Sequence, residues 1–77
     1  MDNDSLQRVI TIVRSTGSLA VELGADDDFY DAGFSSINAL QLLLELETAF
    51  DVAIPDDDFV TARTCAALHG LVQRLAQ

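Results

Sequence analysis

The chain has 77 residues, and with 13 Asp and Glu against four Lys and Arg its formal net charge at pH 7 is −9. That charge excludes nucleic-acid binding by phosphate neutralisation and argues against binding to an anionic membrane surface. The hydrophobic content of 49% is too high for an unfolded acidic tail, so we expect one folded domain over residues 1–77, too small for a cleft between domains.

An amphipathic helix is predicted near the start of the chain and should end at Gly17. Asp4 and Gln7 have the spacing of a capping box, and apolar residues recur at helical intervals at Leu6, Val9, Ile10 and Val13. This periodicity is lost between Ser18 and Ser35, which predicts a long loop. Because the loop is rich in apolar side chains, we expect it to pack on the helices through Leu19, Val21, Leu23, Phe29 and Phe34.

A second helix is predicted from Ser36 to Phe50, because this segment is rich in leucine and contains neither Gly nor Pro. Its wide apolar stripe consists of Leu40, Leu43, Leu46 and Phe50, with Leu42 and Ala49 beside them. We expect residues 51–55 to end this helix. Residues 56–59 should then form one short helical turn, because acidic residues favour a helix N-terminus.

The last helix is predicted to follow Thr64, whose side chain can cap it, and to run to the C-terminus. Its apolar positions repeat the helical spacing at Leu68, Leu71, Val72 and Leu75. Gly70 lies in its middle, which predicts a close helix crossing there. No segment has the alternation typical of a strand. The sequence therefore predicts an all-α fold, a small antiparallel bundle of three main helices and one short helix.

The reactive side chains form no complete catalytic or metal site in the sequence. Cys65 and His69 lie four residues apart on the predicted last helix, but a metal would need further ligands, so we interpret the cysteine as a packing residue. The aspartate runs 26–28 and 56–58 lack the ligand spacing of a calcium loop. A single cysteine permits no internal disulfide, and no apolar run reaches membrane-spanning length. We therefore expect a cytoplasmic protein without membrane insertion.

The remaining candidate site is the junction between the long loop and the second helix, at residues 31–37. A glycine turn at Gly33 delivers two serines to the start of the helix. Ser35 suits an N-cap. Ser36 would then be the first helical residue, exposed near unpaired N–H groups and the positive end of the helix dipole, which suits a bound phosphate. Two serines at this place can also be helix caps and nothing more, so the motif alone leaves both interpretations open.

Residues 33–37 read Gly-Phe-Ser-Ser-Ile and match the pattern Gly-x-(Asp/His/Ser)-Ser-(Leu/Ile). Through this motif the chain resembles the acyl and peptidyl carrier protein family, whose members open their second helix with it. The similarity extends upstream to Phe29. Downstream it continues over nearly the whole chain, at Leu42, Leu46, Glu47, Phe50, Ile54, Pro55, Asp57, Phe59 and residues 64–68.

The resemblance implies that Ser36 carries 4'-phosphopantetheine derived from coenzyme A, and that the chain is a non-catalytic, monomeric carrier of acyl or aminoacyl thioesters. The partners that it implies are a phosphopantetheinyl transferase, a loading enzyme that is an adenylating enzyme or an acyltransferase, and downstream synthase, condensing or tailoring enzymes. The motif and docking residues that it implies are Gly33, Phe34, Ser35, Ile37, Leu44 and Glu45.

Charge and two departures from the family pattern refine this hypothesis. No basic residue lies between Val21 and Phe59, so docking should use arginine- or lysine-lined partner surfaces and weaken in salt. Ser35 stands where fatty-acid carriers have Asp, and the neutral Asn38 and Gln41 stand where they place acids. These departures predict a discrete carrier of a specialised, secondary-metabolite pathway.

The residues alone also permit another class, a small acidic adaptor that binds a partner helix and has no prosthetic group.

Overall fold

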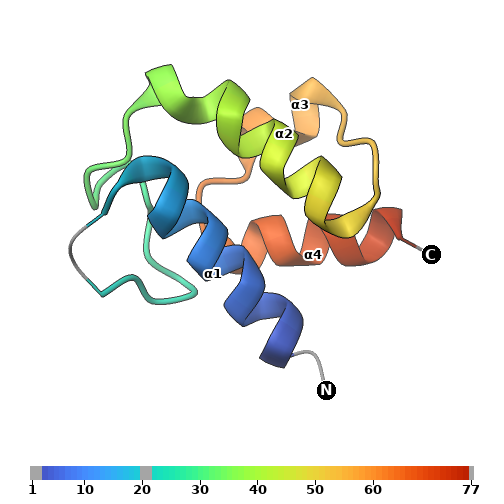
Figure 1. Ribbon diagram of the computed structural model, residues 1–77, viewed down its shortest axis with the longest axis horizontal. Helices are drawn as coiled ribbons and strands as arrows, with labels where there is room; N and C mark the ends of the chain where they lie inside the picture. The colour runs from blue at the N-terminus through green and yellow to red at the C-terminus, as the bar shows by residue number, and fades with distance from the viewer. Residues whose placement is uncertain (1–2, 20–21, 77) are drawn as a thin grey trace.

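The structure is a computed structural model that describes residues 3–19 and 22–76. Its elements in chain order are α1 (Asn3–Gly17), the 3-10 helix η1 (Ser36–Asn38), α2 (Ala39–Phe50), α3 (Asp56–Thr61) and α4 (Cys65–Leu75). Within the described residues the only β pairing is an isolated bridge between Asp28 and Thr64. The predicted all-α fold, with three main helices and a short one, is confirmed (Figure 1).

The core lies where α1 packs against both α2 and α4. The long loop between α1 and α2 also contributes to it, as predicted, because Leu23, Phe29 and Phe34 are buried and Leu19 is half-buried. Val21 was expected to do the same and lies outside the described residues. Figure 1 shows this loop folding back along α1 before it reaches the start of η1. The helices supply the other large buried side chains, among them Val9, Val13, Leu42, Leu46, Leu68 and Val72.

Two helix starts differ from the prediction. The helix α1 begins at Asn3, so Asp4 lies inside its first turn and is not the N-cap. The predicted second helix is divided, since residues 36–38 wind as a 3-10 turn before α2 begins. Short 3-10 turns are common at helix N-termini, where the first N–H groups have no partner within the helix.

The apolar stripe of α2 also differs from the prediction. Leu42 and Leu46 are fully buried, whereas Leu40 has 65% of its surface exposed. Leucines at 40, 42, 43, 44 and 46 cover more than half of the helix circumference, so periodicity alone does not identify the buried ones.

The close approach predicted at Gly70 is wrong. A Cβ added to Gly70 would meet no atom within 4 Å, so no neighbouring element requires a glycine there. The close approach occurs instead at Gly17, where an added Cβ would lie 2.5 Å from Cδ2 of the buried Phe34 ring. The last residue of α1 is therefore small because a loop side chain packs directly on its backbone.

We expect Gly17→Ala and Gly70→Ala to change stability in opposite directions. Alanine is favoured over glycine in helices by about 1 kcal/mol, and Gly70→Ala should gain up to that amount because the site is open. In Gly17→Ala the new methyl group forces the buried Phe34 ring to move, which should lower the free energy of unfolding. Urea denaturation of both variants tests this, and an unchanged or raised stability of Gly17→Ala would contradict the packing.

Candidate functional site

The turn before the serine pair depends on the backbone conformation of Gly33. Its φ of 113° lies in a region that residues with a side chain rarely adopt. An added Cβ would meet only Leu19 Cδ2, at 3.7 Å, so conformation and not space requires the glycine. The Gly33 N–H donates to the Tyr30 carbonyl at 3.2 Å, which closes the turn.

Phe34 anchors the end of this turn in the core. Only 4% of its surface is exposed, and its ring meets those of Phe29 and Tyr30 edge to face, with centroids 5.3 and 5.7 Å away. Its N–H donates to the Phe29 carbonyl at 2.9 Å. Among the motif and docking residues that the resemblance implies, Phe34 therefore belongs to the motif, because its side chain is buried as predicted for the loop and is inaccessible to a partner. Burial of this side chain fixes the position of the backbone directly before Ser35.

Ser35 and Ser36 have the different positions that the sequence predicts. Ser35 is the N-cap of η1, with extended backbone angles (φ −82°, ψ 135°), and its Oγ accepts a hydrogen bond from the Ile37 N–H at 3.2 Å. Ser36 is the first residue of η1 and is exposed. No acidic residue lies in this first turn. The N–H groups of Ile37, Asn38 and Ala39 already donate within this turn, to Ser35 Oγ, Ser35 O and Ser36 O. The site therefore offers an exposed hydroxyl at the positive end of the helix, with no carboxylate in that turn to repel a phosphate group.

Three exposed apolar side chains follow the serines along one side of η1 and α2. We call Ile37, Leu40 and Leu44 the apolar row; their exposed fractions are 89%, 65% and 49%. Leu40 was missed from the sequence, because its helical spacing placed it in the buried stripe. Glu45 is exposed beside the row and accepts a hydrogen bond from Gln41 Nε2 at 2.8 Å. Together, the row and Glu45 offer apolar contact area and one oriented carboxylate.

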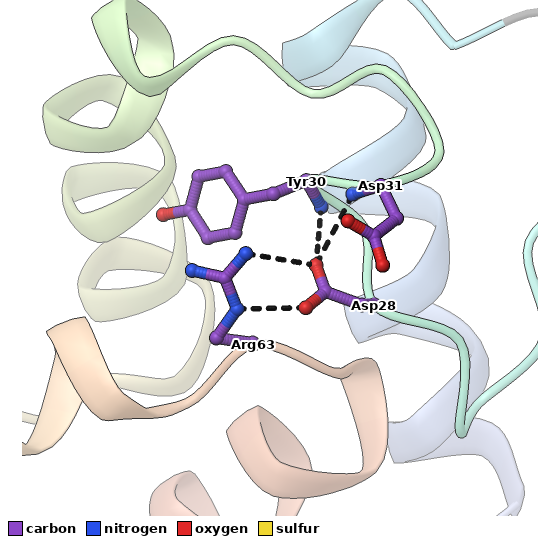
Figure 2. A network of polar contacts seen from close by, with 4 residues as sticks. All are labelled: Asp28, Tyr30, Asp31 and Arg63. Carbon is purple, nitrogen blue, oxygen red and sulfur yellow. Dashed lines mark hydrogen bonds and ion pairs between the residues drawn. The ribbon is translucent and has the colours of Figure 1, made fainter.

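A polar contact that the sequence does not predict joins the long loop to the segment between α3 and α4 (Figure 2). Arg63 Nε donates to Asp28 Oδ2 at 2.7 Å and Arg63 Nη2 to Oδ1 at 3.4 Å. Asp28 Oδ1 also accepts the N–H groups of Tyr30 and Asp31, at 2.9 and 3.2 Å. The Arg63 guanidinium carbon lies 4.6 Å from the Tyr30 ring centroid. We call these side chains of Asp28, Tyr30 and Arg63 the clamp.

Cys65 belongs to the buried core and His69, four residues further along α4, is half-buried. Cys65 is fully buried, and this desolvation, with a smaller contribution from the charge of Asp27, raises the pKa of its thiol to about 11. Across residues 3–19 and 22–76, no group of three or more His, Cys, Asp or Glu side chains is placed to hold a metal ion. The same part of the chain contains no helix long and apolar enough to cross a membrane.

Comparison with known proteins identifies the class of this site. The family model for a phosphopantetheine attachment site matches residues 7–72. An acyl carrier protein of Syntrophobacter fumaroxidans (strain DSM 10017 / MPOB) is 35% identical over 60 residues, which cover 68% of this chain and 74% of that protein. The chain therefore belongs to the phosphopantetheine-binding carrier family, with 4'-phosphopantetheine as its covalent cofactor. Proteins of this family are generally non-catalytic and interact with enzymes of acyl transfer and synthesis. Membership favours the carrier over the adaptor that the sequence left open.

The clamp predicts a pH dependence of stability. The hydrogen bond from Arg63 is the main cause that lowers the pKa of the Asp28 carboxyl below its ordinary value of 3.8, with the Asp31 and Tyr30 N–H groups acting in the same direction and partial desolvation opposing them. A lowered folded-state pKa stabilises the fold above the ordinary pKa, and this contribution is lost as the pH falls through the folded-state pKa. The stability difference between the unsubstituted chain and Asp28→Asn should therefore be largest near neutrality and shrink below pH 3.8. Urea denaturation across pH 2–7 measures it, and a constant difference would contradict the assignment.

Proposed function

We propose that Ser36 is the residue to which 4'-phosphopantetheine is attached, and that the chain presents an acyl or aminoacyl group as a thioester on this arm. One observation carries the proposal: of the two adjacent serines, which are both exposed, Ser35 uses its hydroxyl to cap η1, whereas Ser36 is the first residue of that helix and is not its cap. An exposed hydroxyl is what a modifying enzyme needs. Its surroundings also suit the product, because the positive end of the helix dipole favours a phosphodiester.

The modification is a phosphoryl transfer in which this chain supplies the nucleophile. The Ser36 hydroxyl oxygen bonds to the phosphorus of coenzyme A that bears the pantetheine. The P–O bond within the pyrophosphate breaks, and the adenosine bisphosphate part leaves. The serine proton passes to a base of the phosphopantetheinyl transferase. A thioester formed on the terminal thiol is activated for transfer, and tethering raises its effective concentration at each enzyme that docks the bundle.

Docking would use the row Ile37, Leu40 and Leu44 for apolar contact and Glu45 for charge. The row adjoins Ser36, so an enzyme that covers it also reaches the arm. The partners we propose are a transferase that installs the arm, an adenylating enzyme or acyltransferase that loads it, and synthase, condensing or tailoring enzymes that use the cargo. The net charge of −9 favours partner surfaces lined with arginine or lysine.

We further infer that this carrier takes part in a specialised pathway and not in fatty-acid synthesis. The first turn of α2 has no acidic residue, and neither does η1, where the resemblance places acids in fatty-acid carriers. Gln41 instead donates to Glu45 and orients that single carboxylate. An enzyme that selects carriers by several charges along the early turns would find only one here, which lowers the association rate with such an enzyme.

The modification site is tested by intact mass after incubation with coenzyme A and a promiscuous phosphopantetheinyl transferase. Ser36→Ala should show no added mass and should keep its fold. Ser35→Ala should still gain one phosphopantetheinyl group but lose roughly 0.5–2 kcal/mol of stability, because it lacks the N-cap. Peptide mapping that places the arm on Ser35 would overturn the proposal.

The pathway inference is tested by Asn38→Asp, which adds one charge at the start of α2 without breaking the Gln41–Glu45 hydrogen bond. We expect malonyl transfer by a fatty-acid enzyme to become faster, with a steeper dependence on salt. Gln7→Glu is the matched control, because it adds the same charge at an exposed position of α1. Equal activity of the unsubstituted chain and a fatty-acid carrier, with no effect of Asn38→Asp, would remove the inference.

A further inference from the structure

The clamp joins two segments that lie far apart in the sequence. Arg63 lies between α3 and α4, and Asp28 lies in the long loop, 35 residues earlier. The two segments also pair through their backbones, since the Phe29 N–H donates to the Arg63 carbonyl at 3.0 Å. Arg63 therefore holds the loop through its backbone carbonyl and through its guanidinium group, and Figure 2 shows the guanidinium contact.

A short series of contacts leads from Arg63 to the serine pair. The guanidinium lies over the Tyr30 ring, and the Tyr30 ring meets Phe34 edge to face. Asp28, held by Arg63, accepts the N–H groups that begin the turn, and the Phe34 N–H closes it on Phe29. Phe34 is followed directly by Ser35 and then Ser36. The start of η1 therefore follows a turn whose first residues are held by Arg63, which comes from another part of the chain.

The clamp makes only a small contribution to the stability of the bundle, because the Arg63 side chain is 52% exposed and its ion pair is screened by solvent. Its fork geometry, with two nitrogens on one carboxylate and a stacked ring, instead fixes the position of the groups that it binds. Phe29 and Phe34 are buried at the two ends of this turn, so loss of the fork would free only the part between them. That part would then hold Ser36 less narrowly in one direction.

We propose that Arg63 is a positioning residue for the modification of Ser36, acting through Asp28, Tyr30 and Phe34; the proposal rests on Ser36 being the attachment site. A transferase binds the carrier in one orientation of the hydroxyl. If only a fraction of the carrier molecules present that orientation, the apparent affinity falls by that fraction. Removal of the clamp should therefore raise the KM for the carrier and leave kcat unchanged.

The test compares Arg63→Gln with Arg74→Gln as carrier substrates of a phosphopantetheinyl transferase with coenzyme A. Both variants lose one positive charge and one ion pair, since Arg74 pairs with Asp58 at 3.7 Å at the other end of α4. We expect the KM of Arg63→Gln to rise about fivefold to tenfold at constant kcat, and Arg74→Gln to match the unsubstituted chain. Arg63→Lys keeps the charge without the fork and should not restore the KM.

Asp28→Asn distinguishes positioning from a direct contact between Arg63 and the enzyme. Under the proposal it raises the KM as Arg63→Gln does, and the double variant is no worse than either single one. If Arg63 acts by direct contact, Asp28→Asn leaves the KM unchanged and the proposal is overturned. Should Arg63→Gln fail to fold, Asp28→Asn alone decides, because an unchanged KM again overturns the proposal.

Amide hydrogen exchange supplies a readout independent of the transferase. In Arg63→Gln the Phe34 amide, which donates to the Phe29 carbonyl, should exchange faster, while the Leu46 amide within α2 keeps its rate. Faster exchange at both amides would indicate general destabilisation and overturn positioning. Ser36→Ala separates the two proposals: an added mass on that variant refutes the attachment site, whereas equal KM values for Arg63→Gln and Arg74→Gln refute the clamp alone.

Discussion

Burial of the Phe34 side chain is the constraint on which the site depends. Its ring packs on the backbone of Gly17 at the end of α1 and against two aromatic rings of its own loop. A ring enclosed on these sides leaves its backbone few conformations, because any rotation would open a cavity or force a clash. The irregular loop is therefore fixed at its last buried residue, and η1 begins from a defined point on the bundle.

The next two residues, Ser35 and Ser36, have different roles: the first is structural and, under our proposal, the second is chemical. The extended conformation and capping oxygen of Ser35 supply what the helix start requires. Its neighbour has no such structural demand, so under our proposal its hydroxyl is available for chemistry. A serine cap in place of an aspartate keeps the cap and removes a negative charge, which makes the first turn a more favourable place for a phosphodiester.

The features predicted correctly from the sequence are those set by local chemistry. The caps at Ser35 and Thr64 are confirmed, since their side chains accept the N–H groups of Ile37 and Ala67. They could be predicted because Ser and Thr side chains readily accept backbone N–H groups at a helix start. The exposure of Leu40 was not predictable, since a helix with leucine on most sides has no unique buried face. The clamp was not predictable either. Asp28 and Arg63 share no motif or period, and only the path of the loop brings them together.

Under the proposed function, in which the cargo is held as a thioester, the burial of Cys65 has a chemical consequence. An accessible thiolate on the bundle would compete for the acyl group, because thiolates exchange readily with thioesters. Burial raises the pKa of the Cys65 thiol to about 11, so the thiol stays protonated at neutral pH, and the core encloses it. The single cysteine of the chain is therefore kept from competing with the arm's own thiol, so packing suppresses acylation of the carrier at Cys65.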